Sequence, residues 1–353
     1  MLPRSRDLVR HLCVPCLMVG LAAAAGCSGT KSTSAPAADA APGTYGTAVP
    51  PTKQPPPNQV GSFAVVLPEI TLQPGDEQTP CFLFDLAVTG PSHIVGGGHI
   101  KVGPGMHHGN ITTRPKTGTG TRPCPADTTS MFGGEGVDIV NGGAVLFASS
   151  TQLSGEEWQS FPPGMGFRVK DGFEIVARMH YLNATDHPIT VAPTYEWFLI
   201  DETKLEHELA PFVWVYKEFT IPPKSTYTAK SAPCAFPKPM NLVSALPHMH
   251  KLGTKLEAQV VGGPNDGADF LASKGYDPEK GVLEQYAPAL DLSQGGQGTG
   301  VTFACTWNNT FDKPITYGIG DNEMCEVFGY AYPPENTYSV IASDQVCVPT
   351  AVR

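Results

Sequence analysis

The feature that most constrains the fold is a succession of short apolar segments broken by glycine and proline. Between Gly61 and Arg353, segments such as FAVVLPEI (63–70), FEIVARMHY (173–181) and LEAQVVG (256–262) are separated by Pro-Gly, Gly-Gly and Asn-Gly. Several alternate polar and apolar residues, the period of a strand with one buried face. The 38 glycines and 35 prolines among 353 residues are too many for a helical bundle. The sequence therefore predicts an all-β fold of antiparallel sandwiches.

The length of the chain allows two domains, because single cores stop growing near this size. The segment ETKLEHELAPF (202–212) carries a cluster of charges and then Pro211, and a strand-like pattern resumes directly after it. We place a domain boundary there, near residue 210. The prediction is two β-sandwich domains, residues 61–209 and 210–353.

Residues 1–26 have the composition of a signal peptide. Arg4, Arg6 and Arg10 precede an apolar stretch at 13–25, and small residues precede Cys27. This pattern resembles a bacterial lipoprotein signal with Cys27 as the lipidated residue, although it has Ala24 where Leu is usual. An ordinary secretory signal is the alternative. Under both interpretations the mature chain is exported, and the lipoprotein reading places it in the bacterial cell envelope, in the periplasm or on the cell surface.

Residues 27–60 are rich in Pro, Ala and Thr, with too few apolar side chains to form a core. We predict a disordered tether here. No later stretch reaches the roughly 18 apolar residues of a membrane span. A lipid on Cys27 would then be the only membrane attachment.

Acidic residues outnumber basic ones, with a formal net charge of −10 at pH 7. Removing residues 1–26 takes away three arginines and one aspartate, which makes the charge −12. No basic run follows residue 10. Because phosphate binding needs clustered Lys and Arg, the sequence argues against a nucleic-acid partner.

Cysteine parity also fits export. Beyond residue 27 six cysteines remain, and none forms a Cys-x-x-Cys pair. An even number in an exported chain favours three disulfides over a zinc site or a catalytic thiol. Parity leaves 15 pairings open. Local closure suggests one bond in the first domain and two in the second, from Cys81, Cys124, Cys234, Cys305, Cys325 and Cys347.

Two histidines at strand spacing are the first candidate metal ligands. His248 and His250, in ALPHMHKLG, would project from one face of a strand with Cα atoms about 6.6 Å apart. Neutral imidazole suits copper, zinc and iron. Met324, in GDNEMCEVFGY, adds a soft thioether that favours Cu(I). The alternatives are a chance His-x-His pair and a methionine that only fills the core.

A second set of candidate ligands lies in the first domain. His107 and His108 are neighbours, so both can bind one metal only where the strand ends or bulges. Glycines on both sides make that distortion inexpensive. His180, in FEIVARMHYLN, is a candidate third ligand, with a hydrogen-bonded, partly buried histidine as the alternative. Arg178 on the same face is either a contact for an anionic ligand or an ion-paired strand residue.

Four motifs together carry a family resemblance. MHHGN, FPPGMGFRV…MHY, LPHMHKLG and GDNEMCEVFGY, in this order, resemble the copper type II, ascorbate-dependent monooxygenases, such as peptidylglycine α-hydroxylating monooxygenase and dopamine β-monooxygenase. The resemblance covers about residues 65–347. It implies two tandem jelly-roll β-sandwiches with a cleft between them. It also implies two copper ions, one held by His107, His108 and His180 and one by His248, His250 and Met324.

The resemblance further implies a reaction and two disulfides. The catalytic residues would be His248, His250 and Met324, whose copper meets O₂ and the substrate C–H bond, while the other copper stores an electron. One oxygen atom would enter the C–H bond, with two electrons from ascorbate or another one-electron reductant. In the second domain the resemblance implies Cys305–Cys325 and Cys234–Cys347. Cys81–Cys124 in the first rests on parity alone.

The substrate is where the chain departs from the peptide-processing member. That enzyme grips a peptide carboxylate through an Arg, an Asn and a Tyr, and the matching positions here are Leu246, Glu326 and Phe328. A carboxylate would meet no cation from these residues. We therefore expect a small-molecule or peptide-like substrate that is not a C-terminal glycine peptide. The alternative functions are an envelope lipoprotein that sequesters copper without catalysis, and a structural envelope lipoprotein with incidental histidines.

Overall fold

The computed structural model describes residues 45–46, 48–50, 52–125, 138, 141–149, 155–276, 283–292, 299–318 and 320–352, without the side chains of residues 108, 148 and 149. The predicted signal peptide, the lipidation site Cys27 and the tether up to residue 44 lie outside these residues.

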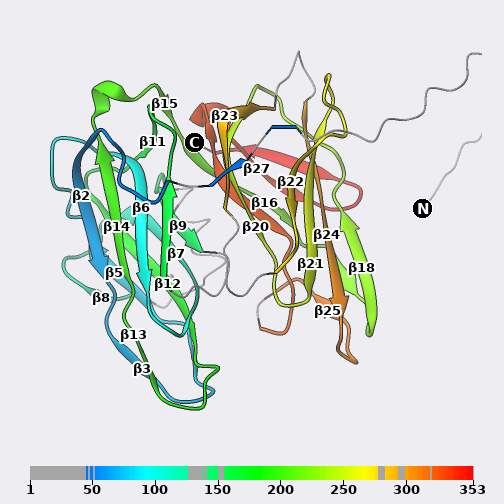
Figure 1. Ribbon diagram of the computed structural model, residues 1–353, viewed down its shortest axis with the longest axis horizontal. Coiled ribbons are helices and arrows are strands. Elements are labelled where there is room, and N and C mark those ends of the chain that lie inside the picture. Colours follow the sequence, from blue (N-terminus) through cyan, green and yellow to red (C-terminus); the bar gives the residue numbers. More distant parts are fainter. Residues whose placement is uncertain are drawn as a thin grey trace, which may run out of the picture. The chain divides into compact units, whose positions relative to one another are not determined.

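Two sheets enclose a first core (Figure 1). One sheet has the strand order β15-β11-β6-β14-β2, with β10 also paired to β6, and the other has the order β8-β5-β12-β7-β9, with β4 also paired to β12. A short ribbon, β3-β13, extends from them. The strands are β2 (Gln59–Val66), β3 (Ile70–Leu72), β4 (Glu77–Gln78), β5 (Cys81–Asp85), β6 (Ile94–Val102), β7 (Met106–Pro115), β8 (Arg122–Pro123), β9 (Val145–Ser149), β10 (Gly155–Ser160), β11 (Met165–Arg168), β12 (Phe173–Leu182), β13 (Ile189–Val191), β14 (Thr194–Ile200) and β15 (His207–Glu208).

Two further sheets enclose a second core. The larger sheet has the order β1-β23-β20-β26-β16-β27-β28, and the smaller has the order β18-β24-β21-β22, with β19 also paired to β24. A ribbon β17-β25 completes this half, and two 3-10 helices, Glu202–Lys204 and Pro334–Asn336, lie in connections. The strands are β1 (Ala48–Val49), β16 (Ala210–Tyr216), β17 (Thr220–Ile221), β18 (Ser225–Lys230), β19 (Cys234–Ala235), β20 (Asn241–His248), β21 (Gly253–Val261), β22 (Asp269–Ser273), β23 (Glu284–Asp291), β24 (Gly300–Asn309), β25 (Ile315–Thr316), β26 (Glu326–Tyr332), β27 (Tyr338–Ala342) and β28 (Cys347–Ala351).

Strand β16 shows how the alternating pattern builds this architecture. Phe212, Trp214 and Tyr216 are buried in the second core, while Val213 and Val215 between them lie on the opposite face. That face is also covered, because Tyr330 of β26 belongs to the first core and its hydroxyl donates a hydrogen bond to the Val145 carbonyl at 2.7 Å. The predicted all-β sandwich architecture is confirmed.

The segment before β2 differs from the predicted disordered tether, because part of it is paired with the sheets. We expected residues 27–60 to be disordered, yet β1 pairs with β23, and the Tyr45 hydroxyl donates to the Asp291 carbonyl at 2.7 Å. The Thr52 amide donates to Ser160 Oγ at 2.8 Å on the other sandwich. These contacts hold the described part of the segment against the sheets despite its composition, and β1 can pair because an edge strand such as β23 offers free backbone donors and acceptors.

Three disulfides join the expected cysteines. They are Cys81–Cys124, Cys234–Cys347 and Cys305–Cys325. The predicted pairings are therefore confirmed. Disulfides persist in oxidising compartments, which agrees with an exported chain. Among the described residues, no helix has the length and apolarity to cross a membrane.

Candidate metal centres

The ends of strands β20 and β26 bring the second-domain candidate ligands together. His248 is the last residue of β20 and lies opposite Glu326, the first residue of β26. Met324 precedes Glu326 by two residues and is buried. The His248 and His250 rings are perpendicular, with centroids 5.3 Å apart. The two-residue spacing thus brings the two imidazoles together at the end of β20.

His250 has one ring nitrogen that a metal can use. Its Nδ1 lies 2.8 Å from the Asn322 carbonyl oxygen, which only accepts, so Nδ1 carries the proton. Its Nε2 is then an acceptor, and this atom is buried without a hydrogen-bond partner among the described residues. Burial lowers the pKa of His250, so the ring is neutral. A neutral imidazole oriented through its other nitrogen is the usual form of a metal-ligating histidine, and this orphaned atom fits a metal ion.

Glu323 links the two ligand segments. Its carboxylate accepts hydrogen bonds from the backbone N–H of His250 at 3.0 Å and of Leu252 at 2.8 Å. The side chain is fully buried, and burial raises its pKa to about 7 while these two bonds act in the opposite direction. Glu323, which directly precedes Met324 in the chain, therefore holds the turn that follows His248. Nothing in the spacing of the acids marks this role, so it could not be recognised from the sequence.

The first-domain histidines lie at a β-bulge, as the sequence predicted. His180 of β12 is opposite His108, but Tyr181 is opposite Met106, so His107 is an additional residue in β7. Such a β-bulge re-aims side chains. The His107 and His180 rings contact edge to face, with centroids 4.8 Å apart. The side chain of His108 lies outside the description.

Gly105 explains why the chain can turn into this bulge. Its φ is +89°, which disfavours any residue with a side chain, and a Cβ there would lie 2.6 Å from Ile189.

A carboxylate orients His180. Its Nε2 lies 2.6 Å from Glu77 Oε1 on the neighbouring strand β4. A carboxylate on one ring nitrogen fixes the orientation of the ring and raises the basicity of the other nitrogen. Glu77 was also missed by the sequence analysis.

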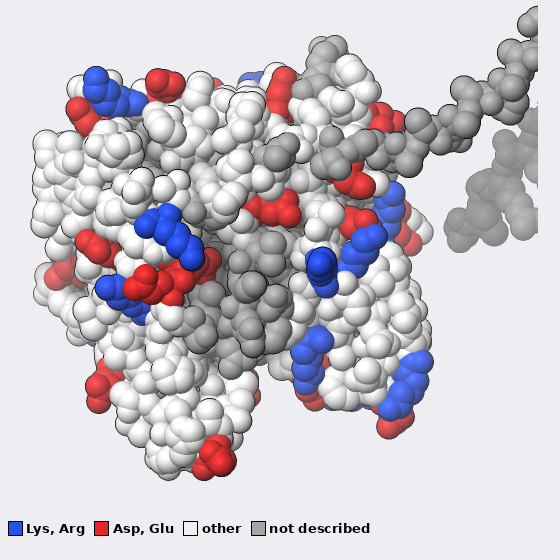
Figure 2. Space-filling view, viewed as in Figure 1, with Lys and Arg blue, Asp and Glu red and all other residues white. Residues whose placement is uncertain are grey.

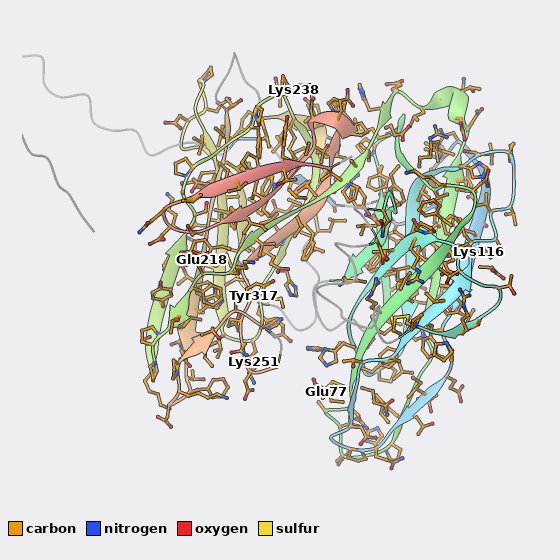
Figure 3. The ribbon with its side chains drawn as sticks, turned by 180° about the vertical axis from the view of Figure 1, so that it is seen from behind. Glu77, Lys116, Glu218, Lys238, Lys251 and Tyr317 are labelled. Carbon is orange, nitrogen blue, oxygen red and sulfur yellow. A yellow bond between two sulfur atoms is a disulfide. The ribbon has the colours of Figure 1, made fainter. Side chains whose placement is uncertain are left out.

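The histidines of one sandwich affect the pKa of those of the other. The pKa of His107 is lowered to about 4, first by burial and then by His180 and by His250 of the other sandwich. Figure 3 shows Glu77 on the first sandwich and Lys251, which follows His250, on the second, at the same end of both. Within the described part of the chain no three His, Cys, Asp or Glu side chains form a group. Neither predicted site could form such a group. One has the Met324 thioether as its third ligand, and the other includes His108, whose side chain is not among those described.

A pocket of about 200 Å³ is lined by residues of β16, β20 and β26, and the three candidate ligands of the second domain are not among them. Its floor is the face of β20, β26 and β16 that carries Leu246, Glu326 and Phe328, the three positions identified in the sequence. His248 lies two residues beyond Leu246 on that face, with its ring 5.9 Å from the Phe328 ring. Strands β9 and β10 of the first sandwich provide the opposite wall.

Two carboxyl groups interrupt the apolar lining. Glu326 accepts a hydrogen bond from the Tyr317 hydroxyl, and burial raises its pKa to about 7. Glu157 of β10 is only partly buried as a residue, but its Oε2 is shielded from solvent and has no hydrogen-bond partner among the described residues. Burial raises the pKa of Glu157 to about 7 as well. The pocket therefore offers acceptors and no cation among its lining residues.

Arg178 takes no part in this pocket. It is fully buried, and its guanidinium donates to Asp138 at 2.7 Å and to Thr112 at 3.1 Å. Of the two interpretations of Arg178, the structure shows the ion-paired strand residue.

On the face of the molecule shown in Figure 2, basic and acidic side chains are interspersed.

The raised pKa of Glu157 predicts a pH-dependent effect of Glu157→Gln. Between the usual carboxyl pKa of 4.5 and about 7, the folded chain holds a proton that the unfolded chain has released, so stability falls as pH rises through this range. Glutamine has no such dependence. We expect equal melting temperatures at pH 5 and a variant more stable at pH 8 by about 2 °C or more, measured by calorimetry. Glu69→Gln, at an exposed residue, should show no pH-dependent difference; an equal offset for Glu157→Gln at both pH values would contradict the assignment.

No protein-family model and no curated protein matches this chain. Among solved structures, the capsid of PBCV-1 virus is similar at 8% identity and a TM-score of 0.21, covering 85% of this chain and 99% of that one. Infectious bursal disease virus, Gx strain, is similar at 10% identity and a TM-score of 0.18, covering 81% and 74%. The VP2 subviral particle of infectious bursal disease virus has 10% identity and a TM-score of 0.17, covering 80% and 75%. Scores this low carry no argument about function.

Proposed function

We propose that this chain is a copper-dependent monooxygenase that hydroxylates a C–H bond of a small molecule with O₂ and an external reductant such as ascorbate. The observation that carries the proposal is the oriented Nε2 of His250, which has no hydrogen-bond partner among the described residues and belongs to a ring 5.3 Å from that of His248. The four motifs resembling copper type II, ascorbate-dependent monooxygenases support it.

The residue types select the metal. Two imidazoles with a thioether at His248, His250 and Met324 suit copper, since thioether sulfur favours Cu(I) over zinc. A second copper would be held by His107, His108 and His180. Bound copper supplies one-electron redox chemistry and activates O₂.

The chain's own residues prepare the ligands. The Asn322 carbonyl keeps the His250 proton on Nδ1 and leaves Nε2 for the metal. Glu323 fixes the turn that carries His250, and Glu77 fixes the His180 ring. Restraints of this kind keep ligand geometry constant while the charge of the metal changes.

The pocket positions the substrate next to His248. Leu246 and Phe328 provide an apolar surface that excludes water from the reacting carbon. The overall change is R–H + O₂ + 2 e⁻ + 2 H⁺ → R–OH + H₂O, in which the carbon is oxidised and the external reductant supplies both electrons. Glu326 and Phe328 favour a substrate other than a C-terminal glycine peptide.

The place of action follows from the N-terminal sequence. We infer that Cys27 carries a lipid that holds the exported chain at the bacterial envelope. The pocket supports catalysis rather than copper sequestration, because storage of a metal requires no substrate cavity.

Substrate-dependent ascorbate oxidation by the copper-loaded chain tests the proposal. Oxygen uptake should rise when a substrate is added, and mass spectrometry should show a product with one added oxygen atom. Met324→Ala should abolish this coupling, while a glycine-extended peptide should not be turned over. Copper binding without a hydroxylated product across a broad panel would instead indicate sequestration.

A further inference from the structure

A segment before β2 joins the two sandwiches, and we call its residues 45–52 the N-terminal strap. At one end the Tyr45 amide donates to the Asp269 carbonyl at 2.7 Å, and β1 pairs with β23 of the second sandwich. At the other end the Thr52 amide donates to Ser160 Oγ on β10 of the first sandwich at 2.8 Å. The chain crosses between the sandwiches again from β15 to β16. The strap is therefore a second connection, and hydrogen bonds hold it to both sandwiches.

Ser160 is the point where the strap and the two sandwiches meet. Its Oγ accepts the bond from Thr52, and its backbone carbonyl accepts a hydrogen bond from the Gln285 side chain of β23. Gln285 is also the partner of Val49 in the pairing of β1 with β23. The strap thus holds β23 from one side while Gln285 reaches the first sandwich from the same strand. Separation of β10 from β23 would break all of these contacts.

The same two strands border the pocket. Gln159, which precedes Ser160 on β10, lines the pocket, and so does Leu283, which lies one residue before the start of β23. No described residue of the strap lines the pocket itself. A change in the distance between β10 and β23 would therefore change the width of the pocket, and the strap would act on it by holding these borders.

Gly46 allows the strap to lie close to the second sandwich. Its φ is +80°, in the region that favours glycine, and a Cβ there would lie 2.1 Å from Leu290 Cδ2. Leu290 is buried in the second core, where neighbouring side chains restrict its movement. The hold of the strap is slight by comparison, because β1 has two residues. A side chain added at position 46 should therefore displace the strap and leave the core in place.

We propose that the N-terminal strap is a clasp that fixes the two sandwiches relative to each other and so sets the width of the pocket. The clasp has few hydrogen bonds and pairs with an edge strand, so it opens at a lower free energy than either sandwich unfolds. With the clasp open, the sandwiches stay joined by the connection from β15 to β16 and by the bond from Tyr330 to the Val145 carbonyl. The device involves no metal, so it is independent of the proposed reaction.

Limited trypsin digestion and hydrogen exchange of the full chain test the proposal through Gly46→Ala. Lys53 is exposed and directly follows the strap, so cleavage after it reports how often the clasp is open. We expect Gly46→Ala to raise this cleavage rate about tenfold or more, and to raise amide exchange at Gln285 and Tyr286 by a similar factor. The radius of gyration measured by X-ray scattering should also increase. Gly172→Ala is the matched control, because its φ is +73° and an added Cβ would meet no atom within 4 Å, so all three measurements should stay at wild-type values.

Ser160→Ala supplies a second test that leaves the strap sequence intact. It removes the acceptor for the Thr52 amide but keeps the carbonyl that Gln285 contacts, so cleavage after Lys53 should rise by a smaller factor than in Gly46→Ala. Wild-type cleavage and exchange rates in both variants would overturn the proposal. Faster cleavage with unchanged exchange in β23 and an unchanged radius of gyration would overturn it as well, because the strap would then cross between the sandwiches without holding them.

Discussion

His250→Ala should lower the copper bound at saturation from two ions per chain to one. The imidazole of His250 is a candidate ligand with an oriented nitrogen that has no partner in the described part of the chain, and alanine supplies no substitute for it. The remaining His248 and Met324 would hold a copper ion too weakly to survive dialysis. Metal analysis by mass spectrometry and X-ray absorption, which detects the copper–sulfur bond to Met324, checks this prediction.

His187→Ala is the matched control for that measurement. His187 is exposed and contacts Asp186, so its removal should leave both copper ions in place. The two-site assignment would fail if wild type bound fewer than two ions, or if His250→Ala retained two together with the copper–sulfur signal.

Glu323→Ala should destabilise the fold and weaken the same metal site. The substitution removes the only acceptor shown for the N–H groups of His250 and Leu252, and unsatisfied buried donors cost about 1–3 kcal/mol each. We expect a loss of roughly 3 kcal/mol in the free energy of unfolding. Because the His250 turn loosens, copper affinity at this site should fall by about 10- to 100-fold. Chemical denaturation and copper titration measure the two effects.

Glu323→Gln and Asp321→Ala distinguish positioning from general damage. Glutamine keeps one acceptor oxygen and should recover part of the copper affinity. Asp321 is an exposed partner of Lys251 and Lys313, so its loss should leave both the stability and the copper affinity close to those of the wild type. Unchanged copper affinity in Glu323→Ala, with stability reduced, would limit Glu323 to a structural role.

The alternation of polar and apolar residues predicts a strand that has one buried face. It is a weaker guide at the centre of the first sandwich, where a strand is buried almost throughout. In β16 the alternation in the sequence matches the alternation of burial. In β12 nearly every residue is buried, including Glu174 and Arg178. These charges are tolerated because each is ion-paired, Glu174 with Arg114 and Arg122 and Arg178 with Asp138. No local pattern predicts such partners.

The candidate ligands followed from spacing, but the groups that position them did not. The two-residue spacing of His248 and His250 predicted that both lie on one face, and the glycines beside His107 predicted a bulge. By contrast, His250 and the Asn322 carbonyl are 72 residues apart, and His180 and Glu77 are 103 apart. Contacts at these separations depend on how the strands are ordered in the sheets.

By itself the sequence determined the all-β architecture, the export of the chain and the three disulfides, because period, composition and parity act locally or in simple counts. The tertiary structure alone decided that Tyr45 and β1 are hydrogen-bonded to the second sandwich and that Glu323 clamps the His250 turn. These features arise where distant strands meet, and burial then determines which polar atoms lose water and which retain a partner.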